Sequence, residues 1–148
     1  MIGGLCGKTE CMGTNIKLKR KIPELINPFI DSANLAVSIV EKTKNSTLPS
    51  DYQLVFFLFV FGALDDLCQI LKIGQKDTLD ILNEIVLSQL GNGNKKLAKG
   101  FFKIVVETSS KNEGEGIMRI GGQAHSEWRR GDSMAPVESL SRILDAMF

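Results

Sequence analysis

The stretch LVFFLFVFGAL, residues 54–64, decides the fold that we expect for this chain. It holds no polar side chain, so a helix formed by it is apolar on every side and has to be surrounded by other apolar groups. A membrane-spanning helix needs about 20 apolar residues in succession, whereas Asp65 and Asp66 follow this stretch directly. We therefore predict a buried central helix over about residues 51–73 and no membrane insertion.

The sequence on both sides of this helix also has helical spacing, with apolar residues three or four positions apart. In the segment 95–108, this spacing predicts that Leu97, Phe101 and Ile104/Val105 face inward while the lysines face outward. No segment alternates apolar and polar residues as a strand would. The chain is predicted to be all-α, a single-domain bundle of five to six amphipathic helices around the central one, with helices over residues 23–45, 76–90, 95–108, 117–128 and 135–148.

The N-terminal end differs from the rest of the chain. Residues 1–21 are rich in glycine, lack sustained periodicity and end in a basic run, so we expect a flexible tail there and a single helical domain over 22–148. Pro28 is expected near the start of the first helix, where its missing N–H does least harm. Met12 is an alternative start of the chain.

Length and composition place the chain among ordinary globular proteins. Its 148 residues fit one domain. The formal net charge of +1 gives no overall attraction to nucleic acid or to anionic lipid. Three cysteines cannot all pair, and no signal peptide is recognisable, so a reducing, cytoplasmic location is expected.

Two adjacent glycines, Gly121 and Gly122, lie inside the segment IMRIGGQAHSEWRRGD, residues 117–132. Each glycine inside a helix costs about 1 kcal/mol relative to alanine, so a close contact should offset that cost. Because the apolar spacing continues through the pair, we interpret it as the place where another helix, the apolar central one, packs closely. The alternative is a ligand-binding loop.

The sequence contains no recognisable catalytic, phosphate-binding or metal-binding motif. The segment GGLCGKTE, residues 3–10, resembles only the end of a phosphate-binding loop, and no strand precedes it. Cys6 and Cys11 could supply two soft ligands, but a closed zinc site needs four, and only Cys68 and His125 remain. We therefore expect no metal and no cofactor, and assign no enzymatic activity.

The function we expect is that of a small cytosolic interaction module. The aromatic middle of the chain is more apolar than a few thin helices can cover, and an uncovered apolar patch is typical of an association surface. A homodimer is the expected assembly, with an unidentified protein as a further partner. Its interface is expected at Tyr52, Phe56, Phe59, Leu140 and Leu144.

Two other functions stay open. A small molecule could bind in a pocket between helices lined by Asp65, His125 and Trp128. Nucleic acid could bind through the clusters of lysine and arginine, although no nucleic-acid-reading motif accompanies them.

Overall fold

The protein is an all-α bundle, as the sequence predicts. The computed structural model describes the backbone of residues 2–90 and 94–148 and the side chains of residues 16–90 and 94–148. No strand occurs in these ranges. Their helices are α1 (Ile2–Lys44), α2 (Tyr52–Ile70), α3 (Gln75–Leu90), α4 (Lys95–Ser109), α5 (Asn112–Arg129) and α6 (Ala135–Met147).

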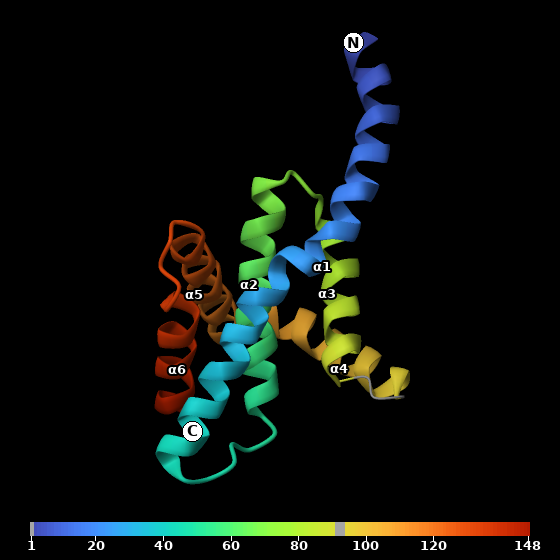
Figure 1. Ribbon diagram of the computed structural model, residues 1–148. Coiled ribbons are helices and arrows are strands. Elements are labelled where there is room, and N and C mark those ends of the chain that lie inside the picture. Colours follow the sequence, from blue (N-terminus) through green and yellow to red (C-terminus); the bar gives the residue numbers. More distant parts are fainter. Residues whose placement is uncertain (1, 91–93) are drawn as a thin grey trace.

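Helix α2 is the central helix. Every residue from Val55 to Leu64 is buried, and Figure 1 shows α2 between α1, the α5–α6 pair and α3. The helix is long and apolar enough to cross a membrane, but 67% of its most apolar 18-residue window is buried within the chain, as in the core helix of a soluble protein. The predicted enclosure of the aromatic segment by protein is confirmed.

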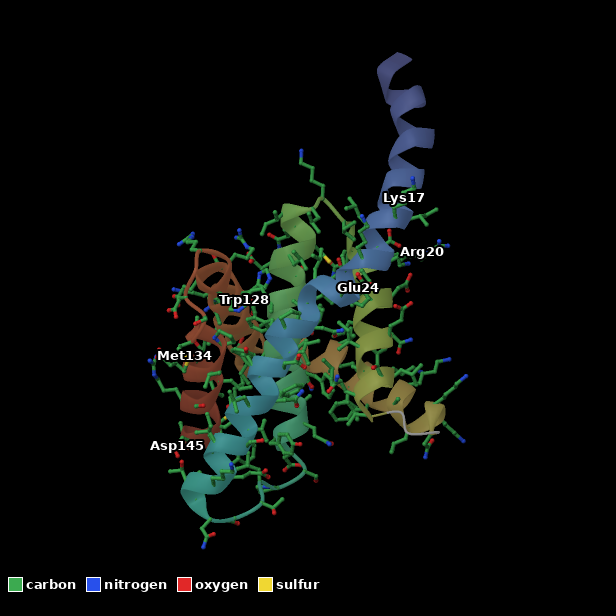
Figure 2. All side chains as sticks on the ribbon, viewed as in Figure 1. Lys17, Arg20, Glu24, Trp128, Met134 and Asp145 are labelled. Carbon is green, nitrogen blue, oxygen red and sulfur yellow. The ribbon has the colours of Figure 1, made fainter. Side chains whose placement is uncertain are left out.

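Helix α1 is longer than expected. The first turns, predicted as part of a tail, are helical and stand clear of the bundle (Figure 1). Pro23 and Pro28 therefore lie inside the helix rather than near its start. Proline removes a helical hydrogen bond, and α1 changes direction close to Arg20 and Glu24 (Figure 2).

The bundle proper begins near the end of the segment predicted as a tail. Lys19 forms ion pairs with Asp77 and Asp80 of α3, with N–O distances of 3.1 and 3.0 Å, and Ile22 is fully buried. The side chains of Cys6, Cys11 and Met12, about which the sequence raised questions, lie outside the described residues.

Helices α2 and α5 cross at almost direct backbone contact. A β-carbon added to Gly121 would overlap the carbonyl group of Phe59, and one added to Gly62 would overlap the carbonyl group of Met118. A β-carbon on Gly122 would lie 3.3 Å from the carbonyl oxygen of Gly62, which is tight but not an overlap. The close-packing interpretation of the glycine pair is confirmed, and Gly62 is the reciprocal member that the sequence analysis missed.

Aromatic side chains tie α1 to this crossing. Phe29 of α1 stacks on Phe59 of α2, with ring centroids 5.5 Å apart. It also meets His125 and Trp128 of α5 edge to face, at 5.5 and 5.9 Å. Figure 2 shows Trp128 on the side of α5 that faces the bundle. Phe29 is thus the residue through which three helices share one aromatic cluster.

Helix α4 is rotated relative to the prediction. Ala98 and Val105 are its buried side chains, and Val105 was expected to face inward. Leu97 and Ile104, also expected to face inward, are exposed, and Phe101 is half-buried. The prediction was wrong for Leu97 and Ile104 because apolar residues occupy more than one face of this helix, and the neighbouring helices cover only one of them.

Candidate functional site

The three residues predicted to line a pocket lie close together but do not share one cavity. Asp65 lines an open cleft of about 590 Å³ between α2 and α5, whose polar wall is built by Asp65, Asp66, Gln69, Arg119 and Gln123. His125 and Trp128 do not line it. They lie behind Asp66, in the aromatic cluster around Phe29.

The buried His125 forms a polar pair with the half-buried Asp66. The distance from His125 Nδ1 to Asp66 Oδ2 is 2.7 Å, and the histidine side chain is only 1% exposed. Because a carboxylate can only accept, Nδ1 carries the proton and donates it. The same carboxylate oxygen lies 3.7 Å from Arg129 Nε. Asp66 thus holds the orientation of the imidazole ring from the floor of the cleft.

Burial decides the protonation of His125. Loss of solvent lowers the pKa of His125, and the hydrogen bond and negative charge of Asp66 raise it only in part. His125 is therefore neutral at neutral pH. With its ring enclosed among Phe29, Asp66 and Trp128, the histidine acts as a structural residue and does not reach a substrate in the cleft.

In the part of the chain that the structure describes, neither a reactive thiol nor a metal centre accompanies the cleft. The Cys68 thiol is free and enclosed in the core, and burial raises its pKa. The reactive thiolate form is therefore disfavoured. Burial likewise raises the pKa of Asp65, which accepts a hydrogen bond from Gln69 Nε2 at 2.8 Å. Over residues 16–90 and 94–148, no three His, Cys, Asp or Glu side chains gather as a metal site would require.

The residues predicted to form a dimer interface lie mostly in the core of a single chain. Phe56, Phe59, Leu140 and Leu144 are buried, and Tyr52 is half-buried and packs against them. The bundle itself covers the aromatic segment, because the reciprocal glycines allow α5 to approach α2 closely and α1 covers another side. An interface at these four side chains would require the core to open.

An uncovered apolar surface exists elsewhere, on α4. Leu97 is 64% exposed and Ile104 is 49% exposed, and both lie on one side of the helix because seven residues complete nearly two turns. With Gly100, Phe101, Asn94 and Lys96, they line a shallow groove whose surface is almost entirely apolar. We call Leu97, Gly100, Phe101 and Ile104 the α4 face.

The groove at the α4 face is open at its centre. An added β-carbon on Gly100 would meet no atom within 4 Å, so among the described residues none fills the space above this glycine. The N-terminal end of α4 lies at the edge of the molecule, beyond α3 in Figure 1. A large partner can therefore reach the face without displacing another helix.

The charge around the α4 face is positive. Helix α4 contains four lysines and one glutamate, and Lys96 and Lys103 are exposed. These two residues are seven positions apart, so they lie on the same side of the helix and form one border of the face. On the other border, Ala98 and Val105 are buried against the bundle.

The sequence contains a signal for this surface that the periodicity analysis did not use. Residues 97–106 hold apolar side chains over an arc too wide for one buried stripe, and a helix at the end of a small bundle has neighbours on one side only. Two apolar stripes on one short helix therefore predict that one of them stays uncovered.

No protein-family model, curated protein or solved structure matches this chain.

Proposed function

We propose that the protein is a small helical interaction module whose docking surface is the α4 face. The observation that carries this proposal is the exposure of Leu97 and Ile104 side by side. Isolated exposed apolar residues are common on protein surfaces, but a contiguous apolar groove is typical of a site of association. An amphipathic helix of a partner, laid along the groove, is the form of ligand that fits such a face.

The proposal keeps the cytosolic location and the role in association that the sequence suggests, but moves the docking surface. A dimer through Phe56, Phe59, Leu140 and Leu144 is not part of it, since these side chains are already buried within one chain. A role in nucleic-acid binding receives less support, because Lys19 of the N-terminal basic cluster is engaged by Asp77 and Asp80.

Small-molecule binding is a second candidate, and the polar cleft beside Asp65 and Asp66 favours it. A small ligand that binds only the folded protein raises its thermal midpoint. A metabolite library screened by thermal shift, with Asp65→Asn as the comparison, would support this candidate if one compound stabilises the native chain and not the variant. Absence of any such compound would count against it.

The test of the docking surface uses a panel of synthetic amphipathic peptides, each about four helical turns long, with acidic, basic or neutral polar faces. Binding to the purified chain is measured by calorimetry. We expect at least one peptide to bind, and Leu97→Gln/Ile104→Gln to weaken it by about tenfold or more, because burying each leucine-sized side chain contributes about 1.5–3 kcal/mol.

The matched control is Leu35→Gln/Ile39→Gln on α1. These residues have comparable exposure, 51% and 39%, and lie on a different helix. Unchanged affinity in this control together with loss in the α4 variant supports the proposal. Equal affinity of the native chain and the α4 variant for every bound peptide, or failure of all peptides to bind, contradicts it.

A further inference from the structure

We infer that the partner of the α4 face is an amphipathic helix with acidic side chains along one border, spaced seven residues apart. This inference rests on the proposed function and adds the chemistry of the partner. The apolar face of that helix would contact Leu97, Phe101 and Ile104. Its acidic border would lie against Lys96 and Lys103.

The spacing of the lysines sets the spacing of the acids. Seven residues of helix rise about 10 Å, close to two turns, so Lys96 and Lys103 mark the two ends of the groove on the same border. A partner helix that lies along α4 presents its residues i and i+7 at the same separation. Carboxylates at these positions can meet both ammonium groups at once. Glu107, the one acidic residue of α4, lies one turn beyond Lys103 on the same side of the helix, past Ile104, where the lining of the groove ends.

The open position at Gly100 adds a second feature of the partner. No atom of residues 16–90 and 94–148 lies within 4 Å of a β-carbon built there, so a partner side chain can descend between Leu97 and Ile104. A large apolar residue midway between the two acids, near i+3 or i+4, would occupy this space. The groove thus specifies both an acidic border and a bulky central apolar residue.

A second copy of α4 does not meet these requirements. If two α4 helices paired antiparallel about a two-fold axis at Gly100, Lys96 of one copy would lie beside Lys103 of the other. Like charges at such a border oppose association. Helix α4 also holds only one carboxylate against four ammonium groups, so self-pairing leaves most of the lysines without a counter-charge.

A lipid surface fits the face less well than a helix does. Helices that lie in a membrane interface are basic along the polar side with a broad apolar face directed into the lipid. On α4 the uncovered apolar face is narrow, because Ala98 and Val105 on one border pack into the bundle. Only the opposite border carries lysines, which suits a single neighbouring helix.

The experiment uses the full chain and a designed peptide whose apolar face carries three leucines, spaced four and three residues apart, and whose polar border has two positions seven residues apart. One version carries glutamate along the border, and its match carries lysine at the same positions. We expect the glutamate peptide to bind about tenfold or more tightly than the lysine peptide at low salt, and the difference to shrink as salt is added. Lys96→Glu/Lys103→Glu should reverse the preference between the two peptides.

The control variant for charge is Lys17→Glu/Lys21→Glu, which changes the net charge equally at two exposed lysines of α1. It should leave the preference for the glutamate peptide unchanged. If both peptides bind equally while Leu97→Gln/Ile104→Gln weakens both, the acidic partner is wrong but the docking surface stands. If Leu97→Gln/Ile104→Gln weakens neither, the proposed function itself fails.

Two further measurements address the other occupants. The first is sedimentation equilibrium, in which any dimer of the native chain should persist in Leu97→Gln/Ile104→Gln. Vesicles of phosphatidylcholine with phosphatidylserine should show no binding that depends on the same two residues. Either dependence would overturn the inference in favour of a second copy or a lipid surface.

Discussion

At the residue scale, the glycines of α5 differ in the space available for an added β-carbon. This difference matters most where α5 crosses α2. Gly121 faces the carbonyl group of Phe59 with no space for a β-carbon, Gly122 is at the limit, and Gly116 on the same helix faces open space. Helical propensity alone would favour alanine at all three positions. The space around each glycine therefore decides whether its substitution by alanine raises or lowers the free energy of unfolding.

Gly121→Ala should lower the free energy of unfolding by several kcal/mol or prevent folding, because the two helix backbones have to separate. Gly122→Ala should cost much less, since a shift of a few tenths of an ångström relieves its contact. Gly116→Ala should raise the free energy of unfolding by up to about 1 kcal/mol. Urea denaturation measures the three values, and equal effects at Gly121 and Gly116 would contradict the close crossing.

The buried His125 makes stability depend on pH. Its pKa in the folded chain lies below the ordinary 6.5, mainly because of burial, so the unfolded chain binds more protons just below that pH. The free energy of unfolding should therefore be independent of this group above about pH 6.5 and should fall as the pH decreases below it, by at most about 1.4 kcal/mol per pH unit.

Urea denaturation between about pH 7.5 and 5.5, compared with His125→Gln, isolates this dependence. The variant should lose the part of the slope that belongs to His125. The raised pKa of Asp65 acts in the opposite direction, and because His125→Gln leaves Asp65 in place, the comparison of the two slopes removes its contribution. Identical slopes in the native chain and the variant would show that His125 is accessible to protons in the folded state.

At the element scale, one aromatic residue of α1 contacts both helices of the α2–α5 crossing. Phe29 is buried and contacts Phe59, His125 and Trp128. Phe29→Leu removes the ring but keeps an apolar side chain, and should lower the free energy of unfolding by about 1–3 kcal/mol. Near-ultraviolet circular dichroism should also show a changed Trp128 signal, and an unchanged signal would contradict the cluster.

Helix α4 offers the opposite case, a helix that can be stabilised without touching the core. Gly100→Ala adds a methyl group to open space and should raise the free energy of unfolding by up to about 1 kcal/mol. The same methyl group partly fills the groove, so affinity for a peptide docked on the α4 face should fall. A loss of stability in this variant would show that the position is not open.

The two helices also show what sequence patterns can and cannot predict. The burial of α2 was predictable because a helix that is apolar on every side has to be surrounded by other apolar groups when it is not in a membrane. The covered side of α4 was not, because Leu97, Ala98, Ile104 and Val105 give two apolar stripes of similar strength. Which stripe is buried depends on the position of α3 and α5, and a local pattern holds no information about that position.

At the scale of the whole molecule, the expected dimer interface shows the same limit. The sequence predicts that a thin bundle leaves part of the aromatic segment uncovered, but the residues chosen for the interface, Phe56 and Phe59 among them, are covered by the close approach of α5. Gly62 and Gly121 make that approach possible. The uncovered surface lies instead on α4, at the edge of the bundle.

The candidate cleft was predictable only in part. Asp65 was expected in a pocket and lines the cleft, but Asp66 rather than His125 forms its floor. Sequence spacing could not show that His125 turns into the core, because its partner Asp66 is 59 residues away along the chain. A single histidine on a helix with small residues on the inward side is compatible with either orientation.

Whether the α4 face is the docking surface is tested by an NMR titration of the isotope-labelled chain with the glutamate-bordered peptide. We expect backbone amide shifts to change mainly over residues 95–109. Leu97→Gln/Ile104→Gln should remove these changes, and Leu35→Gln/Ile39→Gln should not. Shift changes centred on α1 or on the cleft beside Asp65, with α4 unaffected, would contradict it.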